Sequence, residues 1–407
     1  MDRTGDSSGI SRRSALAGAA GGLLAGLAPS MPAAARAASP GAGAVPFHGR
    51  HQAGIVTAQP EALSAAAFDV TAADHGELRD LLRAWSAAAA RMAEGLPSAP
   101  LSDRPERPPE DSGEALGLGP SSLTVTFGFG PTLFVKDGHD RFGLTSSKPR
   151  ALAQIPPMTG DALLPAISGG DLFVQACSDD PQVSFHALRT LIRIAEGAAR
   201  VRWRQFGFGR TARTSAGQQT PRNLQGFKDG TDNILLQDSD SLDRFVWLGS
   251  HDAPRWARGG TYVVTRRIRM LIEPWDRTSL TEQEQTIGRH KVSGAPFGGR
   301  HEHDPIHLAR LPRGSHVRLS HPDSNGGAEI LRRGYSFSEG TDASSGQLDA
   351  GLFFISFQRD PKQFSRIQSR LAAQDRLNRF ITHVGSAVFL CPPGARPGGY
   401  VGETLLG

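Results

Sequence analysis

The apolar positions of this chain repeat with two different periods, and the same succession of periods occurs twice. Alternating apolar and polar residues predict strands, whereas apolar residues three or four positions apart predict one face of a helix. In the first half the succession predicts strand 53–58, helix 78–89, strands 123–129 and 172–176, helix 181–195 and strand 201–206. Asp180 and Pro181 supply the cap and the first-turn residue with which the second helix begins.

The second half predicts the same succession of elements. It comprises a long strand at 261–272, a short helix ended by Gly288, strands 316–320 and 352–357, a helix with Phe364, Ile367, Leu371 and Leu377 on one face, and strand 387–390. Ser279 and Glu282 form a capping box for the short helix. Asp360 and Pro361 begin the later helix. The order β-α-β-β-α-β is that of the ferredoxin-like unit.

The repetition indicates an α+β fold with two tandem ferredoxin-like domains. We expect the first domain to span residues 45–210 and the second to span 211–400, with the join near 207–222. Segment 98–120 is rich in proline and charge and has no apolar period. Such a long segment without its own elements is typical of a surface excursion from the first domain.

The N-terminal residues 1–37 have the pattern of a signal peptide rather than of a folded element. Arg12 and Arg13 precede a moderately apolar run at 15–28, and residues 35–37 fit the A-x-A processing pattern. The run is shorter than the ~20 residues that span a membrane. Paired arginines before a weak apolar run favour the twin-arginine route, although this run begins with alanine where that route usually has phenylalanine. The sequence therefore predicts export of a folded protein to the periplasm or the extracellular space.

Composition narrows the classes of function. The 407 residues carry a net charge of +5, which falls to +3 without the four arginines and two aspartates of residues 1–37. The basic residues are scattered, so we expect no nucleic-acid binding. The two cysteines, Cys177 and Cys391, allow at most one disulfide and exclude a zinc ribbon.

Several catalytic motifs are absent from the sequence. The stretch "RHEHDPIH" places His301, His303 and His307 close together, but proline at 305 replaces the second histidine that a zincin helix requires. A solvated loop is the favoured interpretation. No G-x-S-x-G elbow and no G-x-G-x-x-G dinucleotide fingerprint occurs.

Three separated stretches contain the remaining candidates for chemistry. "NLQGFKDGTDN" (223–233) holds Asp229 between two glycines, and His316 begins the strand predicted at 316–320. Arg332 and Arg333 follow in the apolar stretch "EILRRGYSF", where a guanidinium needs an anionic partner. A lone strand histidine is more often structural than a ligand. With a carboxylate and an arginine, however, it describes the histidine ligand and distal groups of a heme peroxidase.

These stretches, in this order, resemble the dye-decolorizing peroxidases, and specifically their exported deferrochelatase/peroxidase branch. The resemblance is carried by "GFKDG" (226–230), "SHVRLSHP" and "ILRRGYSF", with supporting stretches over nearly the whole chain after residue 37. It implies a heme b cofactor and two ferredoxin-like domains of the dimeric α+β barrel type. It also implies a homodimer.

The resemblance assigns roles to particular residues. His316 would be the axial ligand of the heme iron, with Asp360 or an unidentified acceptor holding its other ring N–H. Asp360 is equally suited to be only a helix cap. Asp229 would move the proton of hydrogen peroxide, and Arg332 would stabilise negative charge and hold a heme propionate. The remaining residues expected to line the heme are Gly230, Thr231, Asp232, His321, Pro322 and Asp323, of which His321 departs from the family's usual asparagine.

The implied activity is reduction of hydrogen peroxide with oxidation of bulky phenolic or dye-like donors. Aromatic residues that could relay electrons from such donors, although each is more often core, are Trp247, Trp256, Trp275 and Tyr335. Release of iron from heme, with iron-uptake components as partners, is a second enzymatic reading. A heme carrier without turnover is the non-enzymatic alternative. We also expect the two glycines beside Asp229 to let the backbone pass close to the porphyrin.

Overall fold

The predicted α+β class is confirmed in the computed structural model, which describes residues 43–101, 104–342 and 345–407. The signal peptide predicted at 1–37 lies outside these residues. The strands are β1 (Ala62–Val70), β2 (Thr124–Phe129), β3 (Leu172–Ser178), β4 (Ala199–Arg210), β5 (Thr261–Met270), β6 (Leu331–Arg332), β7 (Tyr335–Thr341), β8 (Leu348–Gln358) and β9 (Ile381–Cys391). The helices are α1 (His75–Ala93), α2 (Pro131–Phe134), α3 (Pro181–Ile194), α4 (Ser239–Phe245), α5 (Ile272–Asp276), α6 (Leu280–Ile287), α7 (His316–Ser320), α8 (Pro361–Gln374) and α9 (Glu403–Leu406).

The strands form one antiparallel sheet that closes on itself. They pair in the order β5, β9, β2, β3, β1, β4, β7, β8 and β6, and β5 also pairs with β8. Strands of the two halves meet at two seams, where Phe129 pairs with Leu390 and Phe208 pairs with Ser336. Each half therefore contributes a contiguous group of strands to the ring.

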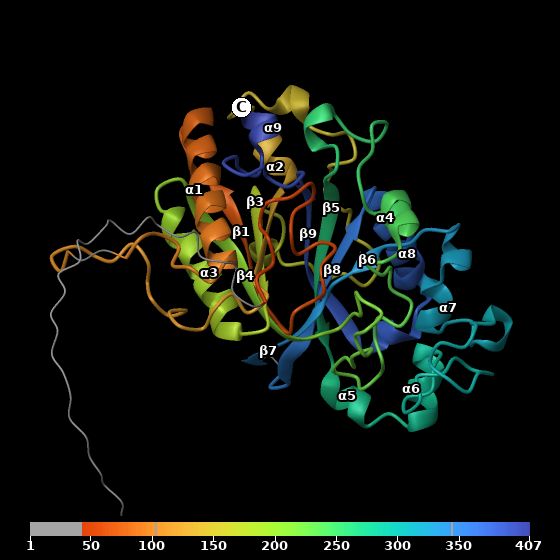
Figure 1. Cartoon of the computed structure of the whole chain (residues 1–407). Helices are drawn as coiled ribbons and strands as arrows, with labels where there is room; N and C mark the ends of the chain where they lie inside the picture. The colour runs from red at the N-terminus through yellow and green to blue at the C-terminus, as the bar shows by residue number, and fades with distance from the viewer. Residues whose placement is uncertain (1–42, 102–103, 343–344) are drawn as a thin grey trace, which may run out of the picture. The chain divides into compact units, whose positions relative to one another are not determined.

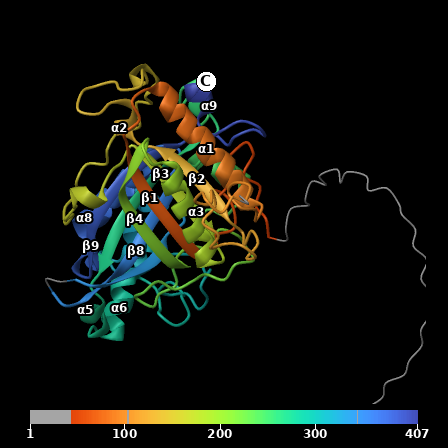
Figure 2. The same ribbon diagram turned by 90° about the vertical axis from the view of Figure 1, so that its left-hand side faces the viewer.

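The two faces of the sheet bury separate cores. Successive side chains of a strand point to opposite faces, and in β1 Leu63 and Ala67 belong to a core shared with strands of the second half, whereas Ala66 and Phe68 pack beneath α1 and α3. Figures 1 and 2 show α1 and α3 against β1 and β3, with α8 on the opposite side of the molecule. Helix α8 nevertheless packs on the same face of the closed sheet as α1 and α3, opposite the shared core, and this face carries the candidate site beside β5 and β8.

The strand predicted at 53–58 is wrong. The segment is a turn in which Gly54 has φ +89°. The Gln52 side chain fixes it by hydrogen bonds to Phe127 and to Pro392 O. The first strand is instead the alanine-rich β1, whose nine residues are all buried. Alanine has low intrinsic strand preference, so tertiary pairing with β3 and β4 decides this strand.

The strand predicted at 316–320 is also wrong, because these residues form the single helical turn α7. Val317 and Leu319 alternate with polar residues, but five residues are too few to separate a period of 2 from one of 3.6. The Leu319 amide donates to Ser315 O at 3.1 Å, and the Ser320 hydroxyl donates to His316 O at 2.8 Å. The turn therefore fixes the backbone that carries His316.

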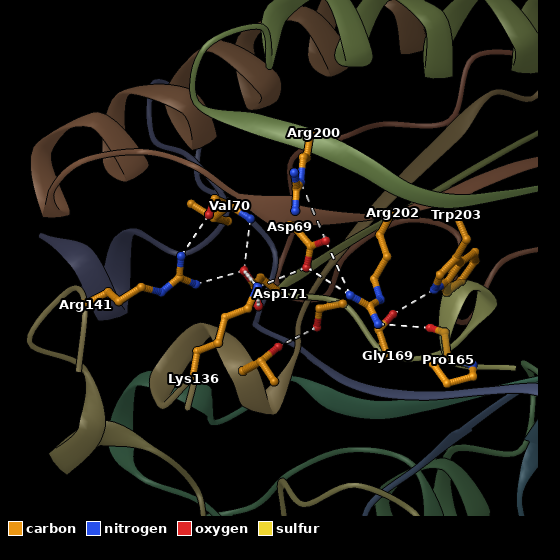
Figure 3. Close-up of polar contacts among 12 residues, drawn as sticks. Asp69, Val70, Lys136, Arg141, Pro165, Gly169, Asp171, Arg200, Arg202 and Trp203 are labelled. Atoms are coloured by element: carbon orange, nitrogen blue, oxygen red, sulfur yellow. Dashed lines mark hydrogen bonds and ion pairs between the residues drawn. The ribbon is translucent and has the colours of Figure 1, made fainter. Parts of the chain in front are cut away.

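A paired cluster of charges fastens the long connection between β2 and β3 to the sheet (Figure 3). Lys136 and Arg141 donate to the buried Asp171, at 3.1 and 2.8 Å, and Lys136 also donates to Asp69 at 3.0 Å. Arg202 donates to Asp69 from β4 at 3.3 Å. Because both buried carboxylates have several cationic partners, we interpret this cluster as structural.

Other sequence expectations have plain outcomes. The loop around His301, His303 and His307 is confirmed as exposed. The described residues of segment 98–120, which are 98–101 and 104–120, form no helix or strand, but Asp111 among them is buried. Cys177 and Cys391 are both free and buried. None of the helices in the described part of the chain combines the length and the hydrophobicity of a membrane-spanning segment.

Candidate active site

A cavity of about 340 Å³ lies among α7, α8, β5, β8, β9 and the loop 223–232. This volume lies within the range of small-molecule and cofactor sites, roughly 300–1,000 Å³. Its apolar wall includes Ile268, Met270, Leu352, Phe354, Ile367 and Leu371. His316, Asp229 and Arg332 line the same cavity, so the structure brings together the three residues on which the sequence hypothesis depends.

His316 is held by a buried carboxylate. Its Nδ1 lies 2.6 Å from Oδ2 of Asp375, whose side chain is 1% exposed. Burial lowers the pKa of His316, but Asp375 more than offsets this effect, so the net pKa lies above its ordinary value. An Nδ1–H donated to Asp375 leaves Nε2 of the neutral ring free as a ligand.

Asp360 is not the partner of His316. It is the N-cap of α8, where its side chain accepts from the Lys362 amide at 2.9 Å and Gln363 completes a capping box. The partner, Asp375, lies just beyond the other end of the same helix. Its second oxygen accepts from the Leu377 amide at 2.8 Å, so one carboxylate caps a turn and orients the imidazole.

Asp229 and Arg332 form an ion pair on the cavity wall. Arg332 Nη1 donates to Asp229 Oδ1 at 2.7 Å, and Asn223 Nδ2 donates to Oδ2 at 3.2 Å. Arg332 belongs to β6, and the Asn233 side chain exchanges two hydrogen bonds with its peptide, at 2.8 and 2.9 Å. Both charged side chains are therefore fixed, with 18% and 29% of their surfaces exposed.

The glycines beside Asp229 have a structural reason within the protein. Gly230 has φ +87°, and an added Cβ would lie 2.6 Å from Ala212 Cα, while Gly226 has φ +83° and faces the Lys291 side chain. The glycines permit left-handed backbone and close packing against neighbouring protein. The contacts that require them are therefore within the chain itself.

The structure places most of the other predicted site residues on the cavity. Gly230, Thr231, Asp232, His321 and Pro322 line it. Asp323 does not line it, and its side chain is 77% exposed. His321 Nδ1 accepts from the Asp323 amide at 3.2 Å, which makes His321 the cap of the turn Pro322–Asn325.

The anionic partner expected for Arg333 is not found within the described residues. Arg333 is fully buried and donates Nη1 to Thr57 O, but its Nε and Nη2 have no protein partner there. Burial lowers the pKa of Arg333. The two adjacent arginines thus differ: only Arg332 reaches the cavity and a carboxylate.

Sequence reasoning missed several residues of the cavity. His383 and Arg266 lie side by side on adjacent strands, with Arg266 Nε donating to His383 Nδ1 at 3.3 Å and Asp161 pairing with Arg266. Burial and the neighbouring Arg266 lower the pKa of His383 to about 4, so its ring is neutral. Arg266 stands between Thr265 and Arg267, so no alternation with apolar residues marked it in the sequence.

The aromatic residues suggested as relays differ in exposure. Trp256, Trp275 and Tyr335 are buried in cores, at 8%, 1% and 0% exposure. Trp247 is half-buried and stacks on His51 with ring centroids 3.7 Å apart. Trp247 therefore remains the candidate nearest to solvent.

The residues of this cavity fit heme. An apolar wall suits the macrocycle, the Nε2 lone pair of His316 suits iron, and Arg332 can pair with a propionate. No group of three or more histidine, cysteine, aspartate or glutamate side chains suited to a metal ion is found in the described ranges. A single histidine ligand is what heme iron requires from the protein.

Comparison with known proteins agrees with this chemistry. The family models "Dyp-type peroxidase, N-terminal" and "Dyp-type peroxidase, C-terminal" match residues 52–209 and 220–396. The chain belongs to the Dyp-type peroxidase family, and it is a heme-dependent peroxidase.

Its relatives place it on the deferrochelatase branch of that family. Deferrochelatase of Escherichia coli (strain K12) is 38% identical over 374 residues, which cover 89% of this chain and 87% of the relative.

Solved structures show the same fold. Ferric DtpA from Streptomyces lividans is 41% identical with a TM-score of 0.80, covering 89% of this chain and 96% of that one. A DyP-type peroxidase from Cellulomonas bogoriensis is 38% identical with a TM-score of 0.79, covering 91% and 99%. A DypB variant from Rhodococcus jostii RHA1 in complex with heme, 22% identical with a TM-score of 0.61, shares the fold and covers 84% and 98%.

Proposed function

We propose that this peroxidase reduces hydrogen peroxide at the Asp229–Arg332 pair and oxidises bulky phenolic or dye-like donors. The observation that carries the proposal is that this pair and the His316–Asp375 pair line one apolar cavity. When bound, heme would supply the redox chemistry there, and His316 would hold its iron through Nε2. The DypB variant that shares this fold was solved in complex with heme, which agrees with heme as the cofactor.

Asp229 would transfer one proton, and Arg332 would stabilise one developing negative charge. The Asp229 carboxylate takes a proton from one oxygen of hydrogen peroxide and returns it to the oxygen that leaves as water. Arg332 stabilises the negative charge that develops as the O–O bond breaks, because its guanidinium is already oriented by Asp229 and by β6. Gly230, Thr231, Asp232, His321 and Pro322 would line the bound heme.

The test of this proposal is an absorption spectrum of the hemin-reconstituted protein before and after peroxide is added. Wild-type protein should show a Soret band that shifts with peroxide, and His316→Ala should lose the heme band. Asp229→Asn and Arg332→Leu should retain heme but react with peroxide about 10²-fold or more slowly. Unchanged peroxide reactivity in both variants would favour a heme carrier instead.

Iron release from heme is a second candidate activity, favoured by the deferrochelatases among the relatives. It would connect the protein to iron-uptake partners. Incubation with heme, with and without peroxide, should then produce the fluorescence of metal-free protoporphyrin. A heme-loaded protein that turns over peroxide without this fluorescence would be a peroxidase alone.

We further propose how the protein is organised and where it acts. The strand orders β2-β3-β1-β4 and β9-β5-β8-β7 support two ferredoxin-like domains, residues 45–210 and 211–400, and a homodimer of the α+β barrel type is proposed with them. Export by the twin-arginine route rests on the sequence of residues 1–37. The N-terminal sequence of the exported protein tests export, because it should begin after residue 37. Sedimentation tests the homodimer, because it gives the mass of the assembled protein.

A further inference from the structure

Glu302 belongs to the loop that contains His301 and His303, which the proposed reaction does not use. It contacts the Asp229 loop (223–232) and does not line the main cavity. Its side chain is 13% exposed and forms an ion pair with Lys228. Its other oxygen accepts from Thr231 Oγ1 at 3.0 Å. One carboxylate thus holds residues on both sides of Asp229 in the sequence.

The same segment holds the loop at a further point. The buried Arg289 donates to Asp232 Oδ2 and to Glu302 O, both at 2.8 Å, and it also donates to Gly294 O at 2.8 Å. Side chain and backbone of Glu302 therefore belong to one set of bonds that reaches Lys228, Thr231 and Asp232. We call this set the clamp.

The Asp229 loop needs such a support because it is bracketed by flexible residues. Gly226 and Gly230 both have φ above +80°, and glycine adopts many other conformations at little energetic cost. Within the loop, the Asp229 amide donates to Pro221 O at 2.9 Å. The Asn223 amide donates to Phe227 O at 3.0 Å and Arg222 donates to Gly226 O at 2.8 Å, so these bonds hold the first part of the loop, whereas the clamp adds bonds to Lys228, Thr231 and Asp232 around the carboxylate.

Glu302 cannot act on peroxide directly. It does not line the main cavity but an adjacent polar pocket, which also includes Arg222 and His303, and Lys228 lines both spaces. Burial raises the pKa of Glu302, but hydrogen bonds from Lys228 and Thr231 more than offset this, so the net pKa lies below its usual value. The clamp therefore keeps its negative charge in mildly acidic solution.

We propose that Glu302 is a positioning residue for peroxide reduction, which holds Asp229 toward the cavity through Lys228 and Thr231. The inference rests on the proposed role of Asp229. Because displacement of a catalytic group by about 1 Å can slow a reaction by as much as 10²-fold, loss of the clamp should affect the peroxide step specifically.

The test compares Glu302→Gln with wild type in the hemin-reconstituted protein. The kcat/KM for hydrogen peroxide should fall about tenfold, while kcat/KM for the reducing donor and the affinity for hemin stay unchanged. Lys228→Met should show the same selective loss, and the double variant should lose no more than either single one. The matched control is Glu282→Gln. Glu282 belongs to α6, and its exposed carboxylate is paired with Arg379.

Hydrogen exchange of the heme-free protein provides a readout independent of catalysis. Glu302→Gln and Lys228→Met should speed exchange of the Asp229 amide, and Glu282→Gln should not. Unchanged exchange, or equal losses for peroxide and donor, would overturn the inference about Glu302. Failure of the proposed function would appear differently, as peroxide reactivity that Asp229→Asn leaves intact.

Discussion

At the scale of single residues, the Asp375 carboxylate shows how one group can serve the fold and the site together. One oxygen caps the turn after α8, and the other accepts from His316. The Asp375 side chain that orients the imidazole is therefore itself fixed by a backbone amide. Such outer-shell partners strongly affect how well a histidine binds a metal.

Asp375→Asn should weaken hemin binding by about 10- to 100-fold. The amide keeps the shape of the side chain but loses the charge that favours an Nδ1–H donor on His316. Titration of heme-free protein with hemin measures the change. An affinity equal to that of wild type would show that Asp375 does not support the ligand.

Gly230→Ala should destabilise the protein more than Gly327→Ala does. Both glycines have positive φ, at +87° and +75°, but only at Gly230 would a Cβ meet backbone atoms within 4 Å. The positive φ costs about 1–3 kcal/mol in either variant, and the clash with Ala212 adds to it at Gly230. Urea unfolding of both variants gives the comparison, and equal losses would contradict the packing argument.

At the scale of elements, α8 separates two aspartates that sequence alone could not distinguish. Asp360 begins the helix and Asp375 follows it, so only the latter reaches His316. The helix supplies Phe364, Ile367 and Leu371 to the cavity wall. Its position thus determines both the apolar surface and the histidine partner.

Asp360→Ala should lower the free energy of unfolding by about 0.5–2 kcal/mol. Loss of the cap leaves amides in the first turn of α8 without their acceptor. Hemin affinity of the folded protein should stay close to that of wild type, in contrast to Asp375→Asn. A marked loss of hemin affinity would show that Asp360 also supports His316.

A second element, segment 98–120, should dock on α3 in a pH-dependent way. Burial raises the pKa of Glu114, but hydrogen bonds from His186 and Arg189 outweigh this effect, and its pKa is lowered to about 2. A carboxyl group with a lowered folded-state pKa stabilises the fold above its unfolded pKa, and this contribution is lost as pH falls through the folded value.

Glu114→Gln should therefore destabilise the protein at pH 6, and its difference from wild type should shrink between about pH 4.5 and 2. Urea unfolding of both proteins across this range is the measurement. A difference that stays constant with pH would mean that the charge of Glu114 contributes nothing. His186 and Arg189 of α3 are the partners on which the expectation depends.

At the scale of the whole molecule, the β5–β8 pairing and the two seams join both halves into one closed sheet. A core shared by strands from both halves lies on one face of this sheet. Disruption of one half therefore removes packing partners from the other. We expect the candidate heme cavity, although built from the second half, to depend on the stability of the first.

Leu191→Ala in α3 should lower the stability of the heme site as well as that of its own half. Leu191 is fully buried beneath α1, and such a truncation costs about 2–5 kcal/mol. Loss of the Soret band and loss of far-ultraviolet circular dichroism should move together to lower urea concentration. Separate transitions would show that the two halves unfold independently.

The sequence by itself determined the class of the fold and pointed to the three groups that line the candidate site. In long amphipathic helices such as α1 and α3, the helical spacing of apolar residues can be recognised over many positions. Asp229, His316 and Arg332 lie in sequence motifs whose order along the chain is distinctive. These features are local, because periodicity and motif order are written along the chain. The secondary structure of short or alanine-rich elements such as α7 and β1 cannot be predicted from such a spacing.

Only the tertiary structure decided which carboxylate meets which partner. Asp375 lies 59 positions from His316, and Glu302 lies 74 positions from Lys228, so no sequence period relates them. Their contacts depend on where α8 and the 289–304 loop pack against the sheet. Chain distance carries no information about such pairs, because the closing of the sheet sets the spatial neighbours of every loop attached to it.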